Sequence, residues 1–334
     1  MENHRGELII LNALSPRSTS LDLVKIKRME HMKKLKLASL ILLAGASFNS
    51  AFAATKLDLN TPEGANMAMR KIQCSTIDDK PVFYWWKGKV FSRRQGEVDK
   101  HIFNVEGMNV RTCGTVDGGK KGKAYRLVTR EILLYTDKKT GQPLDTWENP
   151  WTNEVVDVHH VLNDPVNQPP SFPRNEDGTA SPWKQKFGGD IKGDYWWMTF
   201  PVPLFYHNDL GGDYQKQVGG VYHASELFNF SGDLESLTSS EKDTADVHVG
   251  WVRISDWLPF MMMSGREGSI YIHTAGRKVD SFDDMGDVMK TFINEHAPKY
   301  KTPPPTDDDR PNETSWTGYK KVVKGEKFKR QRAQ

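Results

Sequence analysis

Two carboxylate–histidine pairs are the residues of this sequence whose types and spacing could carry out chemistry. Asp157 and His159 lie two positions apart within residues 154–162, which read as a β-strand, and Asp246 and His248 repeat that spacing on a later strand. Residues two apart on a strand share a face. A carboxylate beside an imidazole sets its tautomer and raises its basicity, as acid–base catalysis requires. We interpret the pairs as catalytic bases with their orienting acids, as metal ligands, or as outward-facing polar positions of half-buried strands.

Motifs for metals and nucleotides are absent from the sequence. No histidines are spaced as His-x-His or His-Glu-x-x-His, and no phosphate-binding glycine loop, dinucleotide fingerprint or Gly-x-Ser-x-Gly elbow is present. We therefore predict no metal ligands and leave the cofactor undetermined.

Two arginines are candidate ligand-binding residues. Arg126 and Arg130 share a strand face with Val128 and Ile132. Charged residues placed among apolar strand residues either face solvent and ion-pair partners or reach into a cavity, where arginine suits a carboxylate-bearing ligand.

Aromatic residues are abundant, and all ten Trp and all ten Tyr follow residue 53. Several are adjacent pairs, whose members point to opposite sides of a strand. One reading is core packing, and the other is a cavity that binds an apolar or aromatic molecule. The candidate ligand-binding tryptophans are Trp85, Trp147, Trp151 and Trp197.

Residues 32–53 have the features of a signal peptide. A basic start at Met32 is followed by an apolar run from Leu37 to Ala46 and a small-x-small cleavage site that ends at Ala53. The run is about ten residues long, whereas a membrane span needs about 20, so we expect no integral membrane anchor. We predict a periplasmic or secreted protein, with residues 1–31 as upstream translation outside the folded part.

The mature chain is nearly neutral once this leader is removed, because much of the basic excess lies in residues 1–53. This charge argues against a nucleic-acid-binding body. A Lys/Arg-rich tail follows Tyr319 and is either a solvated terminus or a contact for an anionic surface. Cys74 and Cys113 would both enter an oxidising compartment, where they form either a disulfide or two buried thiols.

Strand patterns dominate the mature chain and predict a mainly β fold. Short turns such as 137–141 and 149–153 join successive strands and indicate an antiparallel meander, which we expect to close into a barrel-like or sandwich domain over residues 54–300. Residues 301–334 read as an extended C-terminal segment with the basic tail. Peripheral helices are expected from Thr61 to Gln73, from Ala224 to Leu237 and from Asp283 to His296.

Four segments resemble a known family. They are Asn149–Glu154, Val161–Asn167, Trp257–Met263 and Pro311–Trp316. In their order and type they are similar to the bacterial and fungal family called domain of unknown function 1838. That resemblance implies no catalytic residues, because the family has no established function.

These observations favour an exported protein that binds a small apolar or aromatic molecule in a β-barrel-like cavity. The alternative is an enzyme of proton-transfer, isomerase or lyase type that uses the Asp–His pairs on the same scaffold. A third hypothesis is an envelope interaction protein that uses the basic tail and the irregular loop 163–193. The sequence does not determine the oligomeric state.

Overall fold

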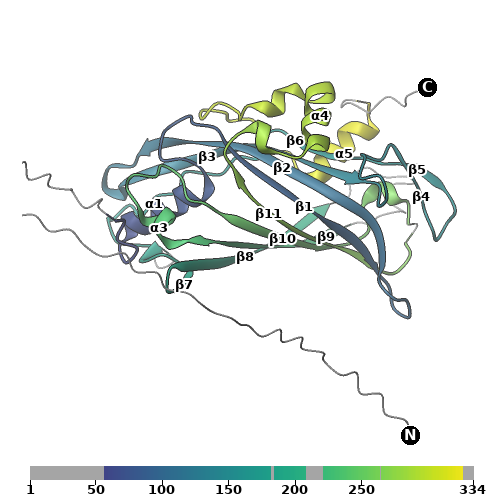
Figure 1. Cartoon of the computed structure of the whole chain (residues 1–334), viewed down its shortest axis with the longest axis horizontal. Helices are drawn as coiled ribbons and strands as arrows, with labels where there is room; N and C mark the ends of the chain where they lie inside the picture. The colour runs from purple at the N-terminus through teal and green to yellow at the C-terminus, as the bar shows by residue number, and fades with distance from the viewer. Residues whose placement is uncertain (1–55, 182–183, 208–220, 264, 326–334) are drawn as a thin grey trace, which may run out of the picture. The chain divides into compact units, whose positions relative to one another are not determined.

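A nine-stranded antiparallel sheet organises the protein (Figure 1). The structure is a computed structural model that describes residues 56–181, 184–207, 221–263 and 265–325. The strand order is β6-β3-β2-β1-β11-β10-β9-β8-β7. The strands are β1 (Val82–Arg93), β2 (Lys100–Asp117), β3 (Lys123–Thr136), β6 (Val161–Asn163), β7 (Asp190–Lys192), β8 (Tyr195–His207), β9 (Val221–Asp233), β10 (His248–Ser255) and β11 (Ser269–Val279).

The sheet consists of two meanders that meet at one seam. The first contains β1, β2 and β3, and the second contains β8, β9, β10 and β11. The seam is the pairing of β1 with β11, which runs from Phe83↔Val279 to Arg93↔Ser269. The mainly β, antiparallel prediction is confirmed, but this sheet ends at β6 and β7 and does not close into a barrel. A separate hairpin pairs β4 (Thr146–Glu148) with β5 (Val155–Asp157).

The two faces of the sheet are covered differently. We call the face that carries Tyr84, Trp86 and Glu131 the inner face, and the opposite one the outer face. The inner face holds two hydrophobic cores, one centred on Phe103, Phe260 and the residues around them, and one beneath α1 (Pro62–Gln73). On the outer face, α4 (Asp287–His296) packs against β1, β2 and β3.

Local sequence explains where α1 begins. Pro62 occupies the first turn, and the Thr61 hydroxyl accepts a hydrogen bond from the backbone N–H of Gly64 at 3.1 Å.

The short α3 (Leu234–Thr238) lies beside α1 at one end of the sheet, and β4 and β5 lie at the other end (Figure 1). The predicted helix from Ala224 to Leu237 is wrong, because most of this segment forms β9.

The described residues belong to one compact unit. The predicted signal peptide, the residues before it and the end of the basic tail lie outside the described residues. Within the described ranges, no helix is long and apolar enough to span a membrane.

Candidate functional site

The middle of the inner face, between the two cores, carries half-buried aromatic side chains. Trp86 packs against both cores, Phe228 against the first and Phe230 against the second. The rings of Phe228 and Phe230 stack with centroids 6.1 Å apart, and Phe230 meets the Tyr84 ring edge-on at 6.3 Å. Half-buried aromatic side chains therefore lie between the two cores of the inner face.

Trp86 extends across β2 because position 107 is glycine. A Cβ atom at Gly107 would lie 2.2 Å from Nε1 of Trp86. The indole thus passes over the place where a side chain would stand and points from β1 towards β3. Its Nε1 is buried and has no hydrogen-bond partner among the described residues.

Glu131 of β3 lies on the inner face, one diagonal step from Gly107, over which this indole passes. Its Oε1 accepts a hydrogen bond from Asn163 Nδ2 at 2.7 Å. Asn163 is 3% exposed, and its own Oδ1 is buried without a partner in the described part of the chain. On the other side of Glu131, Asn109 of β2 accepts a hydrogen bond from Arg111 Nε at 2.9 Å.

Glu226 of β9 and Arg253 of β10 form an ion pair on the inner face. Nη1 of Arg253 donates to Oε1 of Glu226 at 3.0 Å, and the two side chains are 16% and 9% exposed respectively. Burial raises the pKa of Glu226, while Arg253 opposes that shift. Removing two charges from water is costly, and a well-packed apolar pair is often at least as stable. A gain in stability therefore does not by itself account for this pair.

The curvature of the sheet brings the two carboxyl groups towards each other. Burial raises the pKa of Glu131, and the negative charge of Glu226 raises it further, whereas Asn163, Arg111 and Arg253 act in the opposite direction. The neutral form of Glu131, which can donate a hydrogen bond, is therefore more favoured than in an exposed glutamate. We call the whole arrangement the inner-face site; it comprises Trp86, Asn109, Glu131, Asn163, Glu226, Phe228, Phe230 and Arg253.

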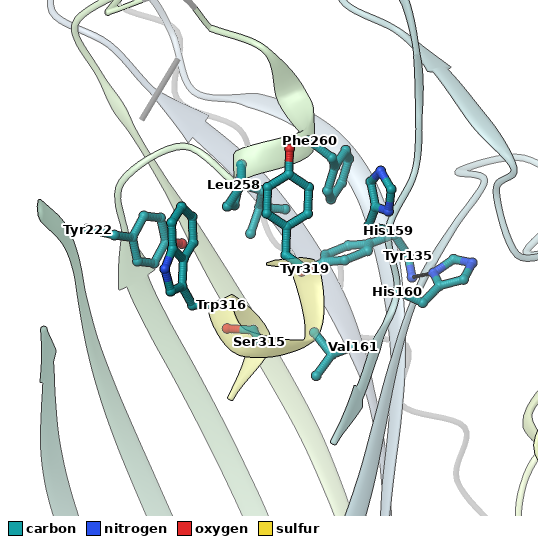
Figure 2. A pocket seen from close by; sticks show the side chains of 11 residues that line it. Tyr135, His159, His160, Val161, Tyr222, Leu258, Phe260, Ser315, Trp316 and Tyr319 are labelled. Carbon is teal, nitrogen blue, oxygen red and sulfur yellow. Dashed lines mark hydrogen bonds between the residues drawn. The ribbon is translucent and has the colours of Figure 1, made fainter. Parts of the chain in front are cut away.

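Helix α5 (Ser315–Val323) lies beside the inner-face site, since Nη2 of Arg253 is 3.5 Å from Oγ of Ser315. Figure 2 shows α5 between Tyr222 of β9 and Val161 of β6. Its Trp316 stacks on Tyr222 of β9 with centroids 6.0 Å apart, and the indole N–H donates to the carbonyl of His207 at 3.0 Å. Tyr319 meets His159 edge-on at 5.1 Å. α5 thus connects the segment that leads into β6 with the β8–β9 end of the sheet.

A small cavity lies beneath α5. Its volume is about 30 Å³. This is room for about one water molecule, far below the roughly 300 Å³ typical of organic ligands. The lining residues are Tyr135, His159, His160, Val161, Tyr222, Leu258, Pro259, Phe260, Ser315, Trp316 and Tyr319 (Figure 2).

The comparison with protein-family models decides the family. A model with the description "Protein of unknown function (DUF1838)" matches residues 79–323. The chain belongs to the DUF1838 family. The matched region begins before β1 and ends with α5, so it contains the whole inner-face site and leaves α1 outside. The resemblance expected from the sequence is confirmed, and no curated protein matches the chain.

The two predicted Asp–His pairs occupy different environments in this DUF1838 protein. Asp157 ends β5, and His159 follows it as a half-buried residue of the cavity beneath α5. His248 is exposed on the outer face of β10, and Asp246 pairs with Lys242 at 3.0 Å. The structure therefore places the two pairs apart, and the inner-face site contains neither.

Arg126 and Arg130 hold the C-terminal segment of the DUF1838 region. Arg126 donates to the carbonyl groups of Thr306 and Asp308 at 3.2 and 2.7 Å. Arg130 forms an ion pair with Asp164 at 2.8 Å. Both arginines therefore lie in an ion-pair and backbone-binding environment away from the inner-face site.

The four predicted tryptophans do not converge on one place. Trp85 is partly buried under α4 and donates to Glu106 at 2.8 Å. Trp147 and Trp151 pack on the first inner-face core, and Trp197 is 39% exposed on β8. A further tryptophan, Trp86, is the one that reaches the inner-face site.

Cys74 and Cys113 form a disulfide. It joins the end of α1 to β2 within a small cluster that includes Tyr125 and Leu127. Among the described residues, no three His, Cys, Asp or Glu side chains are grouped so that they could hold a metal ion.

Sequence reasoning missed Glu226, Arg253 and Asn163 as site residues. The available signal was a charge at an inward-facing position of a strand. On one face of β3, Glu131 precedes the apolar residues Leu133 and Tyr135. On β10, Arg253 follows Trp251 on the same face. Only the curvature of the sheet shows that these charges face one another.

Proposed function

We propose that the protein binds a small organic molecule with an aromatic or apolar ring on the inner face. The observation that carries this proposal is the band of half-buried aromatic and charged side chains between the two hydrophobic cores of the inner face. Trp86, Phe228 and Phe230 provide ring surface, and Glu131 and Arg253 provide polar groups beside it. This combination of an apolar wall with a few placed polar groups is typical of small-molecule sites.

We further propose that binding takes place outside the cytoplasm. The signal-peptide features of residues 32–53 support this location, and a disulfide between Cys74 and Cys113 is compatible with an oxidising compartment.

Binding can be tested with N-phenyl-1-naphthylamine, an uncharged dye that fluoresces in apolar surroundings. We expect saturable binding by the protein that begins at Ala54. Phe230→Ala should raise the Kd about tenfold, because it removes ring surface from the centre of the site.

The matched control is Phe205→Ala, since Phe205 is 68% exposed on β8. It should leave the Kd unchanged. No saturable binding, or equal loss in the two variants, would overturn the proposal.

A further inference from the structure

Two buried polar atoms of the inner-face site lack partners. Trp86 Nε1 is a donor and Asn163 Oδ1 is an acceptor, and neither forms a hydrogen bond with the described residues. Buried polar atoms in native proteins are nearly always paired, and each exception requires an explanation. A bound molecule that accepts one hydrogen bond and donates another would satisfy both atoms.

Glu131 stands between these two atoms on the sheet. Trp86 lies over Gly107, which pairs with Leu133, and Leu133 is two residues from Glu131 on the same face of β3. Asn163 pairs with Glu131 on the other side. Cross-strand and diagonal neighbours on one face are about 5 to 8 Å apart, so Glu131 lies between the two unpaired atoms: it is next to Asn163 and one diagonal step from Gly107, which the Trp86 indole covers.

The charges around Glu131 disfavour an anionic ligand at this point. Glu226 approaches from β9 and Asn163 from β6, while Arg111 on β2, Arg253 on β10 and the more distant Tyr300 complete its titratable and charged surroundings. Arg253 is already paired with Glu226 at 3.0 Å. A ligand carboxylate would therefore lie near the negative charge of Glu226, whose counter-charge on Arg253 is already used.

We infer that the inner-face site recognises a ring-bearing molecule through an uncharged oxygen, a ketone or hydroxyl, which accepts hydrogen bonds from the Glu131 carboxyl and the Trp86 indole. The inference rests on the proposed function and specifies its ligand class. A ketone oxygen accepts from both donors, and a hydroxyl also donates to Asn163 Oδ1.

The test compares 2-acetonaphthone with 2-naphthoate, which share a ring system but carry a ketone and a carboxylate. Displacement of N-phenyl-1-naphthylamine should give a Kd at least tenfold lower for the ketone at a pH below the pKa of Glu131. Above the pKa of Glu131, the Kd of the ketone should rise about tenfold for each pH unit, because the carboxyl group loses its donor proton.

Two near-isosteric variants isolate the donors. Glu131→Gln keeps a donor that does not titrate, so binding of the ketone should become independent of pH. Trp86→Phe keeps a ring but removes the N–H group, and should raise the Kd of the ketone about fivefold, the effect of one lost hydrogen bond. Glu235→Gln and Trp197→Phe are the matched controls, because both side chains are exposed.

The outcomes separate this inference from the proposed function. Equal affinity for both probes, with no effect of pH, Glu131→Gln or Trp86→Phe, would overturn the ligand class even if the dye still requires Phe230. A dye that does not bind at all overturns both.

Discussion

Asp164 is the most heavily paired carboxylate of the described residues. It accepts from Arg130 Nε at 2.8 Å, Lys299 Nζ at 2.6 Å and Arg310 Nη2 at 2.9 Å. Burial alone would raise its pKa, but these three donors prevail and hold the pKa well below its ordinary value of 3.8. This one side chain therefore fastens the segment between α4 and α5 to the end of β6.

Replacing Asp164 should be costly, because Arg130 would stay partly buried without its counter-charge. We expect Asp164→Asn to lower the free energy of unfolding by about 2 to 4 kcal/mol in urea titrations. Asp309→Asn is the control, since its side chain is 87% exposed in its pairing with Arg126, and it should change stability little. Similar values for the two variants would contradict this role.

The same carboxylate predicts a pH dependence. A pKa that is lower in the folded than in the unfolded state gives a stabilisation that is present above the unfolded value of 3.8 and is lost as the pH falls through the folded value. The difference in stability between wild type and Asp164→Asn should therefore shrink as the pH is lowered below about 4.

Gly107 is required by the position of a neighbouring ring rather than by its own backbone. Gly107→Ala would place a methyl group against the Trp86 indole and should destabilise the protein by about 1 to 3 kcal/mol. Gly250→Ala is the matched control on β10, where the added methyl group would lie 3.7 Å from its nearest neighbours. Thermal unfolding that shifts equally in both variants would rule out a specific clash at Gly107.

At the scale of elements, the C-terminal end of α1 is held by side chains from three strands of the sheet. Lys278 Nζ, Tyr84 OH and Arg111 Nη1 donate to the carbonyl groups of successive residues Lys71, Ile72 and Gln73 at 2.7, 2.6 and 3.5 Å. Cations favour this end of a helix because of its dipole. Three adjacent strands thus hold the helix end that the disulfide also anchors.

The disulfide should contribute about 4 kcal/mol to stability on the chain-entropy model, given a sequence separation of 39. We expect the double variant Cys74→Ala/Cys113→Ala to show a loss of that order in urea titrations of the oxidised protein. Under reducing conditions the wild type should approach the variant. Wild-type stability that does not respond to reductant would contradict this prediction.

Most strands were more predictable from the sequence than β9, the strand that follows β8. β1, β3 and β11 contain runs of aromatic and β-branched residues, which favour strands, but 224–237 contains Ala224, Glu226 and Leu227, which favour helices in isolation. Pairing with β8 and β10 on both sides overrides this propensity. The alternation of Glu226, Phe228 and Phe230 on the inner face was the competing signal.

The site was less predictable than the fold, because it depends on curvature. Sequence spacing shows that Asp157 and His159 could share a face, but it cannot show that Glu131 and Glu226 lie across the inner face from each other. Their strands, β3 and β9, are separated by four others in the sheet. A local motif could not have revealed that these two carboxyl groups are close enough to affect each other.

At the scale of the whole molecule, the proposed location makes a direct prediction. If residues 32–53 act as a signal peptide, the protein recovered from the periplasm or culture medium of its host should begin at Ala54. Intact mass spectrometry checks this. Ala53→Leu, which disrupts the small-x-small site, should leave the uncleaved precursor, and a wild-type protein that keeps Met32 in the cytoplasm would contradict export.

The β1–β11 seam has a consequence for how the chain folds. Each meander can form from neighbouring strands, but the seam joins the first strand to the last one of the sheet, so β1 must wait until Val279 is available. Pairings of such large sequence separation are slow to form. We therefore expect the β1 edge to stay unpaired until β11 has been synthesised, and this is the stage at which a holding chaperone would protect the chain from aggregation.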